Sequence, residues 1–212
     1  MLRRSVLALP FTLMAAPPKL PPLSQKIRAF GREWSVFNAA DWQVEGSGRS
    51  EVLHLKVARP QEANPRAPMQ YALANGQDIA KFTLEVEIRP DAGKNNKAGS
   101  NIVVYAWRDN LHFNYVHLSS DTGKEQPVHN GIFHVYGGDR VRISGEEGPR
   151  AFPNVEWTPV RIAYDASKNL VETWVRGEKN PALRGIDLSL GTGRIGLGSF
   201  FNTASFRNFK LS

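Results

Sequence analysis

The stretch Phe82-Thr83-Leu84-Glu85-Val86-Glu87-Ile88-Arg89 alternates apolar and polar side chains at every position. Successive side chains of a β-strand point to opposite faces, so one face of this segment carries four apolar residues and the other carries Glu85, Glu87 and Arg89. Pro90 follows and cannot donate a ladder hydrogen bond, so we expect the strand to end there. The stretch therefore predicts a half-buried strand with one face on a core and the other in solvent.

The same period of two recurs along most of the chain, between turn residues. Val160, Ile162 and Tyr164 alternate with polar residues, and the turn-forming segment Asp165–Asn169 then leads into a second alternating run, Leu170–Arg176, which predicts a β-hairpin. Further candidate strands are Val52–Val57, Met69–Leu73, Ile102–Trp107, Leu111–Leu118, Ile132–Tyr136, Arg140–Ser144, Arg194–Ser199 and Ser205–Leu211. Helical periodicity is nearly missing. We therefore predict an all-β sandwich of two antiparallel sheets.

The N-terminus differs from the rest of the chain. Two arginines precede a short apolar run, residues 5–13, which ends in small residues and is followed by prolines. This is the pattern of a secretory signal peptide, and the run is shorter than the roughly 20 residues of a membrane-spanning helix. We expect a signal peptide over residues 1–16, a Pro-rich linker over 17–25 and a single domain over 26–212. The protein would then be periplasmic or secreted in a bacterium, with no membrane attachment once the leader is removed.

Charge and composition narrow the choice of partner. The chain has 212 residues, a formal net charge of +7 and no cysteine. A basic protein suits an anionic partner, but the lysines and arginines are scattered and form no nucleic-acid motif, so we expect no nucleic acid. An acidic polysaccharide remains compatible with this charge.

Three stretches resemble the concanavalin A-like lectin and glucanase superfamily. They are Asp41-Trp42-Gln43-Val44-Glu45-Gly46, the strand over residues 82–89, and Gly193-Arg194-Ile195-Gly196-Leu197-Gly198 with the later Phe206-Arg207-Asn208-Phe209. Within that superfamily the chain resembles exported bacterial jelly-roll domains of the family-16-like and 3-keto-disaccharide hydrolase kind. The segments over residues 109–118 and 129–133 resemble a subset of these domains. The resemblance implies a concanavalin A-like jelly roll that recognises carbohydrate. It leaves the reaction open, because such sandwiches include lectins, hydrolases and lyases.

Four of the five histidines lie between positions 112 and 134, and this is the most informative chemical feature of the sequence. Tyr115 and His117 share one face of the strand over 111–118, while the pattern does not decide which face is core. We expect a sugar groove in which Tyr115, His117 and His129 are catalytic. Substrate-binding candidates are Tyr105, Trp107, Asn130, Arg140 and Arg142. The alternative is that Tyr115 and His117 simply pack at a sheet edge with satisfied hydrogen bonds.

Two kinds of cleavage need different residues. Most glycoside hydrolases use two carboxylates about 5 Å or about 6.5–9.5 Å apart. Here the family-16 pattern Glu-x-Asp-x-x-Glu is broken, because Glu87 stands at the second position and Pro90 at the third, so a solvated outer face is the favoured interpretation of Glu85 and Glu87. A polysaccharide lyase would instead use Tyr or His as the base and Arg or Asn to neutralise a uronate. The residues around Tyr115 and His117 supply these types.

Metal and stacking sites are weaker predictions. The spacings between the histidines place no two of them side by side on one strand face, so we expect no zinc site and no other bound metal. The loop Arg89–Asn96 offers oxygen ligands for calcium but also contains a lysine, so the calcium signal is weak. Trp107 and Trp174 are the candidates for stacking on a sugar ring.

These patterns lead to one first hypothesis. The protein would be an exported carbohydrate-active protein that binds and cleaves a polysaccharide or oligosaccharide, as a hydrolase or a lyase. The alternative is a non-catalytic, lectin-like carbohydrate-binding module on the same fold. A third option is an adhesion or scaffold domain without a sugar site.

Overall fold

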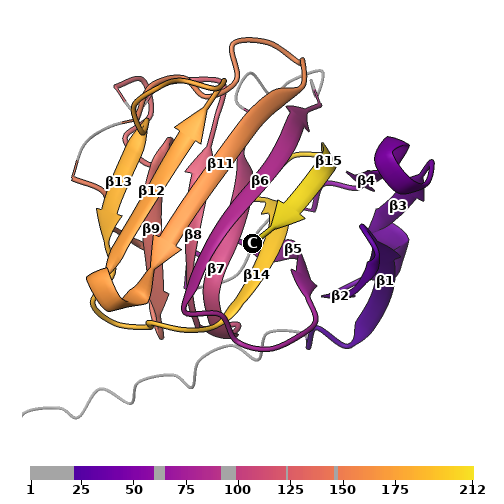
Figure 1. Cartoon of the computed structure of the whole chain (residues 1–212), viewed down its shortest axis with the longest axis horizontal. Coiled ribbons are helices and arrows are strands. Elements are labelled where there is room, and N and C mark those ends of the chain that lie inside the picture. The colour runs from indigo at the N-terminus through magenta and orange to yellow at the C-terminus, as the bar shows by residue number, and fades with distance from the viewer. Residues whose placement is uncertain (1–21, 60–64, 92–98, 123, 146–147) are drawn as a thin grey trace, which may run out of the picture.

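The computed structural model describes residues 22–59, 65–91, 99–122, 124–145 and 148–212. The predicted leader, most of the predicted linker and residues 92–96 of the calcium-loop candidate lie outside these ranges. Two antiparallel sheets pack face to face, with short 3-10 helices between some of their strands (Figure 1). No helix in the described ranges is long and apolar enough to cross a membrane.

The predicted two-sheet sandwich is confirmed, and the strands fall into sheets of eight and seven. The eight-stranded sheet has the order β1 (Gln25–Ala29), β2 (Arg32–Val36), β5 (Gln70–Ala74), β14 (Arg194–Ser199), β7 (Asn101–Asp109), β8 (His112–Leu118), β9 (Gly131–Tyr136) and β10 (Val141–Arg142). The seven-stranded sheet has the order β13 (Leu183–Ile186), β12 (Leu170–Val175), β11 (Thr158–Asp165), β6 (Lys81–Pro90), β15 (Ala204–Leu211), β4 (Val52–Leu55) and β3 (Trp42–Glu45).

Strand β6 lies at the centre of the seven-stranded sheet, between β11 and β15. Its apolar residues Phe82, Leu84, Val86 and Ile88 are all buried between the sheets, as the alternation predicts. The strand includes Pro90 instead of stopping before it. Pro90 is tolerated because it occupies the last position of the strand, where one missing donor leaves the rest of the ladder intact.

The predicted hairpin after β6 is also present. Strands β11 and β12 pair antiparallel through the 3-10 helix η3 (Ala166–Lys168), with Val160 opposite Val175 and Tyr164 opposite Val171. Asn169 closes the turn with a left-handed φ of 55°, a conformation that asparagine tolerates better than most residues.

The eight-stranded sheet is covered on both faces. One face meets the seven-stranded sheet, and the other carries a separate group of buried apolar residues that we call the outer aromatic cluster. Its aromatic members are Tyr71, Trp107, Phe113, Tyr115, Phe133 and Phe200. Strand β8 shows the consequence, because Tyr115 and Val116 point to opposite faces and both are fully buried. Both faces of this strand are therefore core from Phe113 to Leu118.

Gly198 on β14 allows the neighbouring strand β5 to lie close to it. A side chain added at Gly198 would lie 2.2 Å from the carbonyl oxygen of Gln70 and 2.7 Å from the Cα of Tyr71. The neighbouring strand β5 can approach β14 this closely only because position 198 has no Cβ.

Candidate functional site

Most of the residues predicted to form a site do lie together, at the end of the eight-stranded sheet formed by β8, β9 and β10. The ring centroid of His117 lies 6.2 Å from that of Tyr115 and 4.8 Å from that of His129. Arg140 Nη1 donates a hydrogen bond to Tyr115 Oη at 3.2 Å, and Arg142 Nη2 donates to the His129 carbonyl at 2.8 Å. The hairpin register of β8 and β9 produces this grouping.

These residues do not line an open groove. His117 and Tyr115 are fully buried, and His117 stacks on Phe200 with a centroid distance of 5.6 Å. Within the described ranges neither ring nitrogen of His117 has a hydrogen-bond partner of good geometry. Burial, helped by the nearby charges of His129, Arg140 and Arg142, lowers the pKa of His117 well below its usual value, although the Val128 carbonyl opposes this. His117 is therefore neutral and packs against the outer aromatic cluster.

Burial also raises the pKa of Tyr115 to about 12, even though Arg140 favours the phenolate. A tyrosine that acts as a general base needs a pKa near the working pH. In this packed state Tyr115 is therefore a neutral hydrogen-bond partner for Arg140 and has the wrong pKa for a base.

His129 has the surroundings of an oriented imidazole. Its Nδ1 lies 2.9 Å from both carboxylate oxygens of Asp121, so in the neutral form of His129 Nδ1 carries the proton and Nε2 is the acceptor. Ser119 Oγ donates to the same Asp121 carboxylate at 2.5 Å. The side chains of His129 and Asp121 are 13% and 17% exposed, so this pair lies just below the surface. Asp121 was not among the predicted site residues.

Asn130 and Arg142 hold the chain around this pair. Asn130 is buried with a left-handed φ of 45°, its Oδ1 accepts the Ser119 N–H at 2.9 Å, and its Nδ2 donates to the Asp121 carbonyl at 2.5 Å. Arg142 donates to the carbonyls of Pro127 at 2.6 Å and His129 at 2.8 Å. Both side chains donate to backbone carbonyls, and Arg142 donates to Ser144 Oγ as well, which places them as supports for His129.

The two remaining predicted residues lie elsewhere. Tyr105 points into the space between the sheets and contacts Tyr164, with ring centroids 5.0 Å apart. Trp107 belongs to the outer aromatic cluster, where it is only 9% exposed and its Nε1 donates to Tyr71 Oη at 3.0 Å. Neither presents a free surface next to His129.

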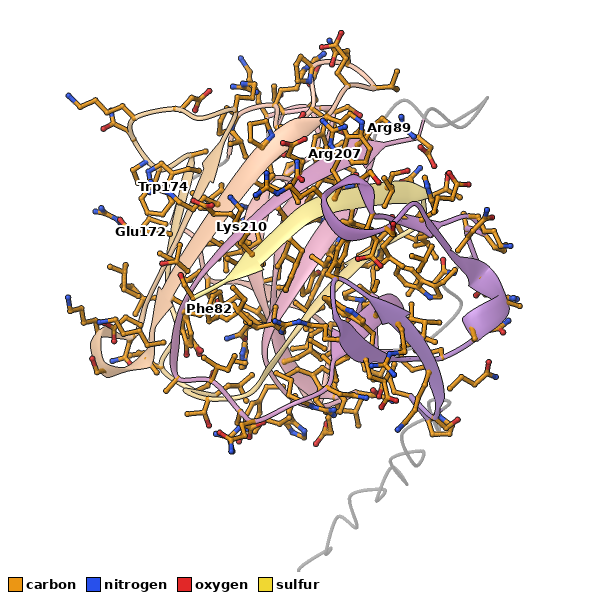
Figure 2. The ribbon with its side chains drawn as sticks, turned by 45° about the vertical axis from the view of Figure 1, so that its right-hand side comes forward. Phe82, Arg89, Glu172, Trp174, Arg207 and Lys210 are labelled. Atoms are coloured by element: carbon orange, nitrogen blue, oxygen red, sulfur yellow. The ribbon has the colours of Figure 1, made fainter. Side chains whose placement is uncertain are left out.

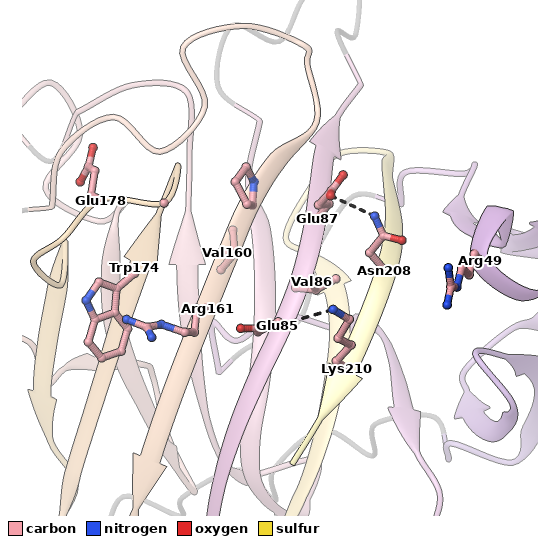
Figure 3. A pocket seen from close by; sticks show the side chains of 12 residues that line it. Arg49, Glu85, Val86, Glu87, Val160, Arg161, Trp174, Glu178, Asn208 and Lys210 are labelled. Atoms are coloured by element: carbon pink, nitrogen blue, oxygen red, sulfur yellow. Dashed lines mark hydrogen bonds and ion pairs between the residues drawn. The ribbon is translucent and has the colours of Figure 1, made fainter.

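An open groove lies on the other side of the molecule, on the outward face of the seven-stranded sheet (Figure 2). Its volume is about 780 Å³, and it crosses β12, β11, β6 and β15. The side chains that give it its chemistry are Glu85, Glu87, Arg161, Trp174, Asn208 and Lys210 (Figure 3). We call it the outer groove.

Charged pairs fix the floor of the outer groove. Glu87 accepts hydrogen bonds from Arg207 at 2.7 Å and from Asn208 at 2.9 Å, while Lys210 lies 4.0 Å from Glu85. Burial acts to raise the pKa of Glu87, but the hydrogen bonds from Asn208 and Arg207 outweigh it and the pKa is lowered. Glu87 is therefore an ionised acceptor and is poorly suited to donate a proton to a leaving group.

Trp174 forms one end of the outer groove. It is half-buried, and the Arg161 guanidinium lies over its ring at 4.0 Å from the centroid. Arg161 is the cross-strand neighbour of both Trp174 and Glu85, so the stacked Arg161 and Trp174 side chains lie next to the carboxylate of Glu85. The result is an aromatic surface with charged hydrogen-bonding groups next to it. Within the described ranges no three histidine, aspartate or glutamate side chains are placed to hold a metal ion.

No model of a known protein family matches the chain, and no curated protein matches its sequence. Solved structures do match. The carbohydrate-binding module CBM66 from Bacillus subtilis superposes with a TM-score of 0.60 at 13% identity, covering 84% of this chain and 94% of that one. The fold is the predicted jelly-roll sandwich of two antiparallel sheets.

Two further structures share this jelly roll. A proposed glycosyl hydrolase from Parabacteroides distasonis ATCC 8503 gives a TM-score of 0.50 at 13% identity and covers 81% of this chain and 82% of that one. A mutant of the GH43 protein BlXynB from Bacillus licheniformis gives 0.55 at 10% identity and covers 89% of this chain. The present chain spans only 38% of that longer protein.

The sequence analysis placed some residues of the outer groove correctly and missed others. Trp174 was a predicted stacking residue, and Glu85 and Glu87 were assigned to an outer face, which is where they lie. Arg161 and Lys210 were missed, because their place beside Glu85 follows from pairing β6 with β11 and with β15. The signal that could have found them is the alternation along these strands, which places Arg161 and Lys210 on the same outward face as Glu85.

Proposed function

We propose that this protein binds carbohydrate and does so in the outer groove. The observation that carries the proposal is Trp174, a half-buried aromatic side chain at one end of an open groove of about 780 Å³ whose other lining side chains are mostly charged or polar. The jelly-roll fold agrees with this proposal, since a carbohydrate-binding module is among the structures that share it.

The chemistry of the outer groove suits a sugar ring. The apolar C–H face of a pyranose packs on an aromatic ring, and its hydroxyls form hydrogen bonds around the edge. Glu85 and Glu87 supply acceptors, and Arg161, Asn208 and Lys210 supply donors. Arg161 is stacked on Trp174 and forms no ion pair with a carboxylate in the part of the chain that the structure describes, so an acidic sugar is also a candidate ligand.

The first prediction is that Trp174→Ala weakens glycan binding about tenfold, since an aromatic contact contributes roughly 1.4 kcal/mol. Binding is measured by calorimetry against neutral and uronate-containing oligosaccharides. Trp174→Phe keeps an aromatic ring and should retain most of the affinity. Val155→Ala, an exposed apolar residue outside the groove, is the matched control. Equal affinity of Trp174→Ala and the control for every bound glycan would remove the outer groove from the proposal.

Cleavage is a second candidate function, favoured by the Asp121–His129 pair. Asp121 holds the Nδ1 proton of His129, which leaves Nε2 to accept a proton from substrate, as a lyase base requires. A hydrolase remains compatible with the fold, although Glu87 in the outer groove is poorly suited to be its acid.

The second prediction separates cleavage from binding. His129→Ala should abolish product release while Trp174-dependent binding persists, and Asp121→Asn should reduce turnover because it no longer holds the tautomer. New reducing ends and the ultraviolet absorbance of an unsaturated product are recorded for the same glycans. Product with no unsaturation excludes the lyase, and binding without any product leaves a lectin-like module.

We also propose that the protein is exported to the periplasm or beyond, on the strength of residues 1–16. N-terminal sequencing of the protein recovered from an expressing bacterium tests this. An intact Met1 in the cytoplasmic fraction would contradict it.

A further inference from the structure

A second exposed surface lies at the margin of the eight-stranded sheet, on different strands from the outer groove. His112 faces Tyr136 across β8 and β9, and Asn114 faces His134. The Tyr136 ring contacts both imidazoles, with centroid distances of 4.8 Å to His112 and 5.4 Å to His134. Two histidines therefore flank one tyrosine.

A buried carboxylate supports this surface from below. Asp187 is only 2% exposed, and its oxygens accept hydrogen bonds from Asn114 at 2.7 Å, Tyr164 at 3.0 Å and Ser189 Oγ at 2.9 Å. Its pKa is nevertheless lowered, because the hydrogen bonds from Ser189, Tyr164 and Leu190 outweigh the effect of burial. A buried anion is costly to desolvate. Here it fixes the orientation of Asn114.

The orientation of Asn114 fixes the tautomer of His134. Asn114 Nδ2 donates to Asp187, so its Oδ1 faces His134 Nδ1 at 2.9 Å, and Nδ1 must carry the proton. Asp109 does the same for His112, with both carboxylate oxygens 2.9 Å from Nδ1. In their neutral forms both imidazoles present Nε2 as a hydrogen-bond acceptor.

Apolar side chains surround these acceptors and remain exposed. Tyr136 is 60% exposed, Val141 is 59% exposed and Leu188 is 81% exposed. Val141 is the cross-strand neighbour of His134, and Leu188 precedes Ser189, whose Oγ lies 3.2 Å from His134 Nδ1. Exposed apolar residues gathered around a fixed polar centre mark a binding surface.

We propose that His112, His134, Tyr136, Val141 and Leu188 form a second sugar-binding site, the edge site. A sugar ring places its apolar face on Tyr136 and donates hydroxyl hydrogen bonds to the Nε2 atoms of the two histidines. The ligand class follows from the proposed function, but the edge site does not depend on the outer groove. A metal is the less favoured ligand, because only two histidines are available and the described ranges hold no three-ligand group.

The test uses nuclear magnetic resonance on the full-length protein carrying Trp174→Ala, labelled with 15N and 13C. Cellohexaose, xylohexaose, maltohexaose and a polygalacturonate hexamer are titrated in turn. We expect at least one glycan to shift the His134 and Tyr136 ring signals, and Tyr136→Ala to weaken that binding about tenfold. Val44→Ala, an exposed apolar residue on β3, is the control and should leave the affinity unchanged.

Three results would overturn the edge site. Shifts confined to outer-groove residues in the protein with native Trp174 would reject the edge site and leave the proposed function standing. Micromolar zinc that perturbs both His112 and His134, with no glycan response, would identify a metal site instead. Glycan shifts at neither surface would reject the proposed function as well.

Discussion

At the scale of single residues, His117 shows why a sequence-predicted site can assemble and yet be closed. The histidine lies next to His129 and Tyr115 as expected, but Phe200 stacks on it from a loop far along the chain. The clustering of histidines is visible in the sequence, whereas the residue that covers one of them is not. His117 consequently contributes to stability in a pH-dependent way.

The third prediction concerns that dependence. Burial lowers the pKa of His117 in the folded protein, whereas its pKa in the unfolded chain is about 6.5. The unfolded state therefore takes up a proton first as the pH falls, and the stability that neutral His117 provides is present above about pH 6.5 and is lost below it. The slope is at most about 1.4 kcal/mol per pH unit.

His117→Leu removes the titrating group and two buried nitrogens that have no hydrogen-bond partner of good geometry among the described residues. We expect it to fold at pH 7 and to lose less stability than the wild type between pH 6.5 and pH 4.5. Urea unfolding at several pH values measures both proteins. Parallel stability curves for wild type and variant would contradict the prediction.

At the scale of elements, the sequence predicts strands well where one face is solvated and less well elsewhere. Strand β6 alternates cleanly because its outward face is the outer groove. Strand β7 contains the nearly continuous apolar run from Ile102 to Trp107, because both faces of its sheet are covered. That covering comes from residues distant in sequence, so alternation along the strand alone does not predict the second layer.

The hairpin of β1 and β2 was missed for a different reason. Its turn residues Phe30 and Gly31 both have positive φ, 54° and 70°, as a tight two-residue hairpin turn requires. Phenylalanine is an unusual choice there, and its strain is roughly 1 kcal/mol. Stacking of Phe30 on Phe209, with centroids 5.6 Å apart, offsets it. The partner is on the last strand, so no local signal predicts the turn.

The fourth prediction is also at this scale and concerns β14. Gly198→Ala should destabilise the protein by about 2–3 kcal/mol, because the new Cβ meets the backbone of Gln70 and Tyr71. Gly138→Ala is the matched control, since a Cβ there meets no atom within 4 Å, and it should change stability by less than about 0.5 kcal/mol. Urea midpoints measure both. Equal midpoints would mean that β5 and β14 separate without loss.

At the scale of the whole molecule, the two proposed ligand surfaces lie on different sheets. The predicted catalytic residues Tyr115 and His117 are instead buried on the face of the eight-stranded sheet that is turned away from the seven-stranded sheet. The all-β sandwich was predictable because period-two patterning sets which residues face a core. The location of the open surface could not be predicted, because it depends on which sheet face the connecting segments cover. Trp174 and Trp107 show this, since both were stacking candidates and only Trp174 lies on an open face.

The covering of the eight-stranded sheet on both sides has a consequence for amide hydrogen exchange. Strands β7 and β8 are central in their sheet, and residues 101–107 and 113–118 are buried on both faces. Their amide protons should exchange with deuterium only when the entire domain unfolds, whereas those of the edge strands β3 and β10 should exchange through local fraying. Mass spectrometry of peptides from residues 101–118 and 42–45 would resolve the two classes. Protection of β7 and β8 would then report the global free energy of unfolding.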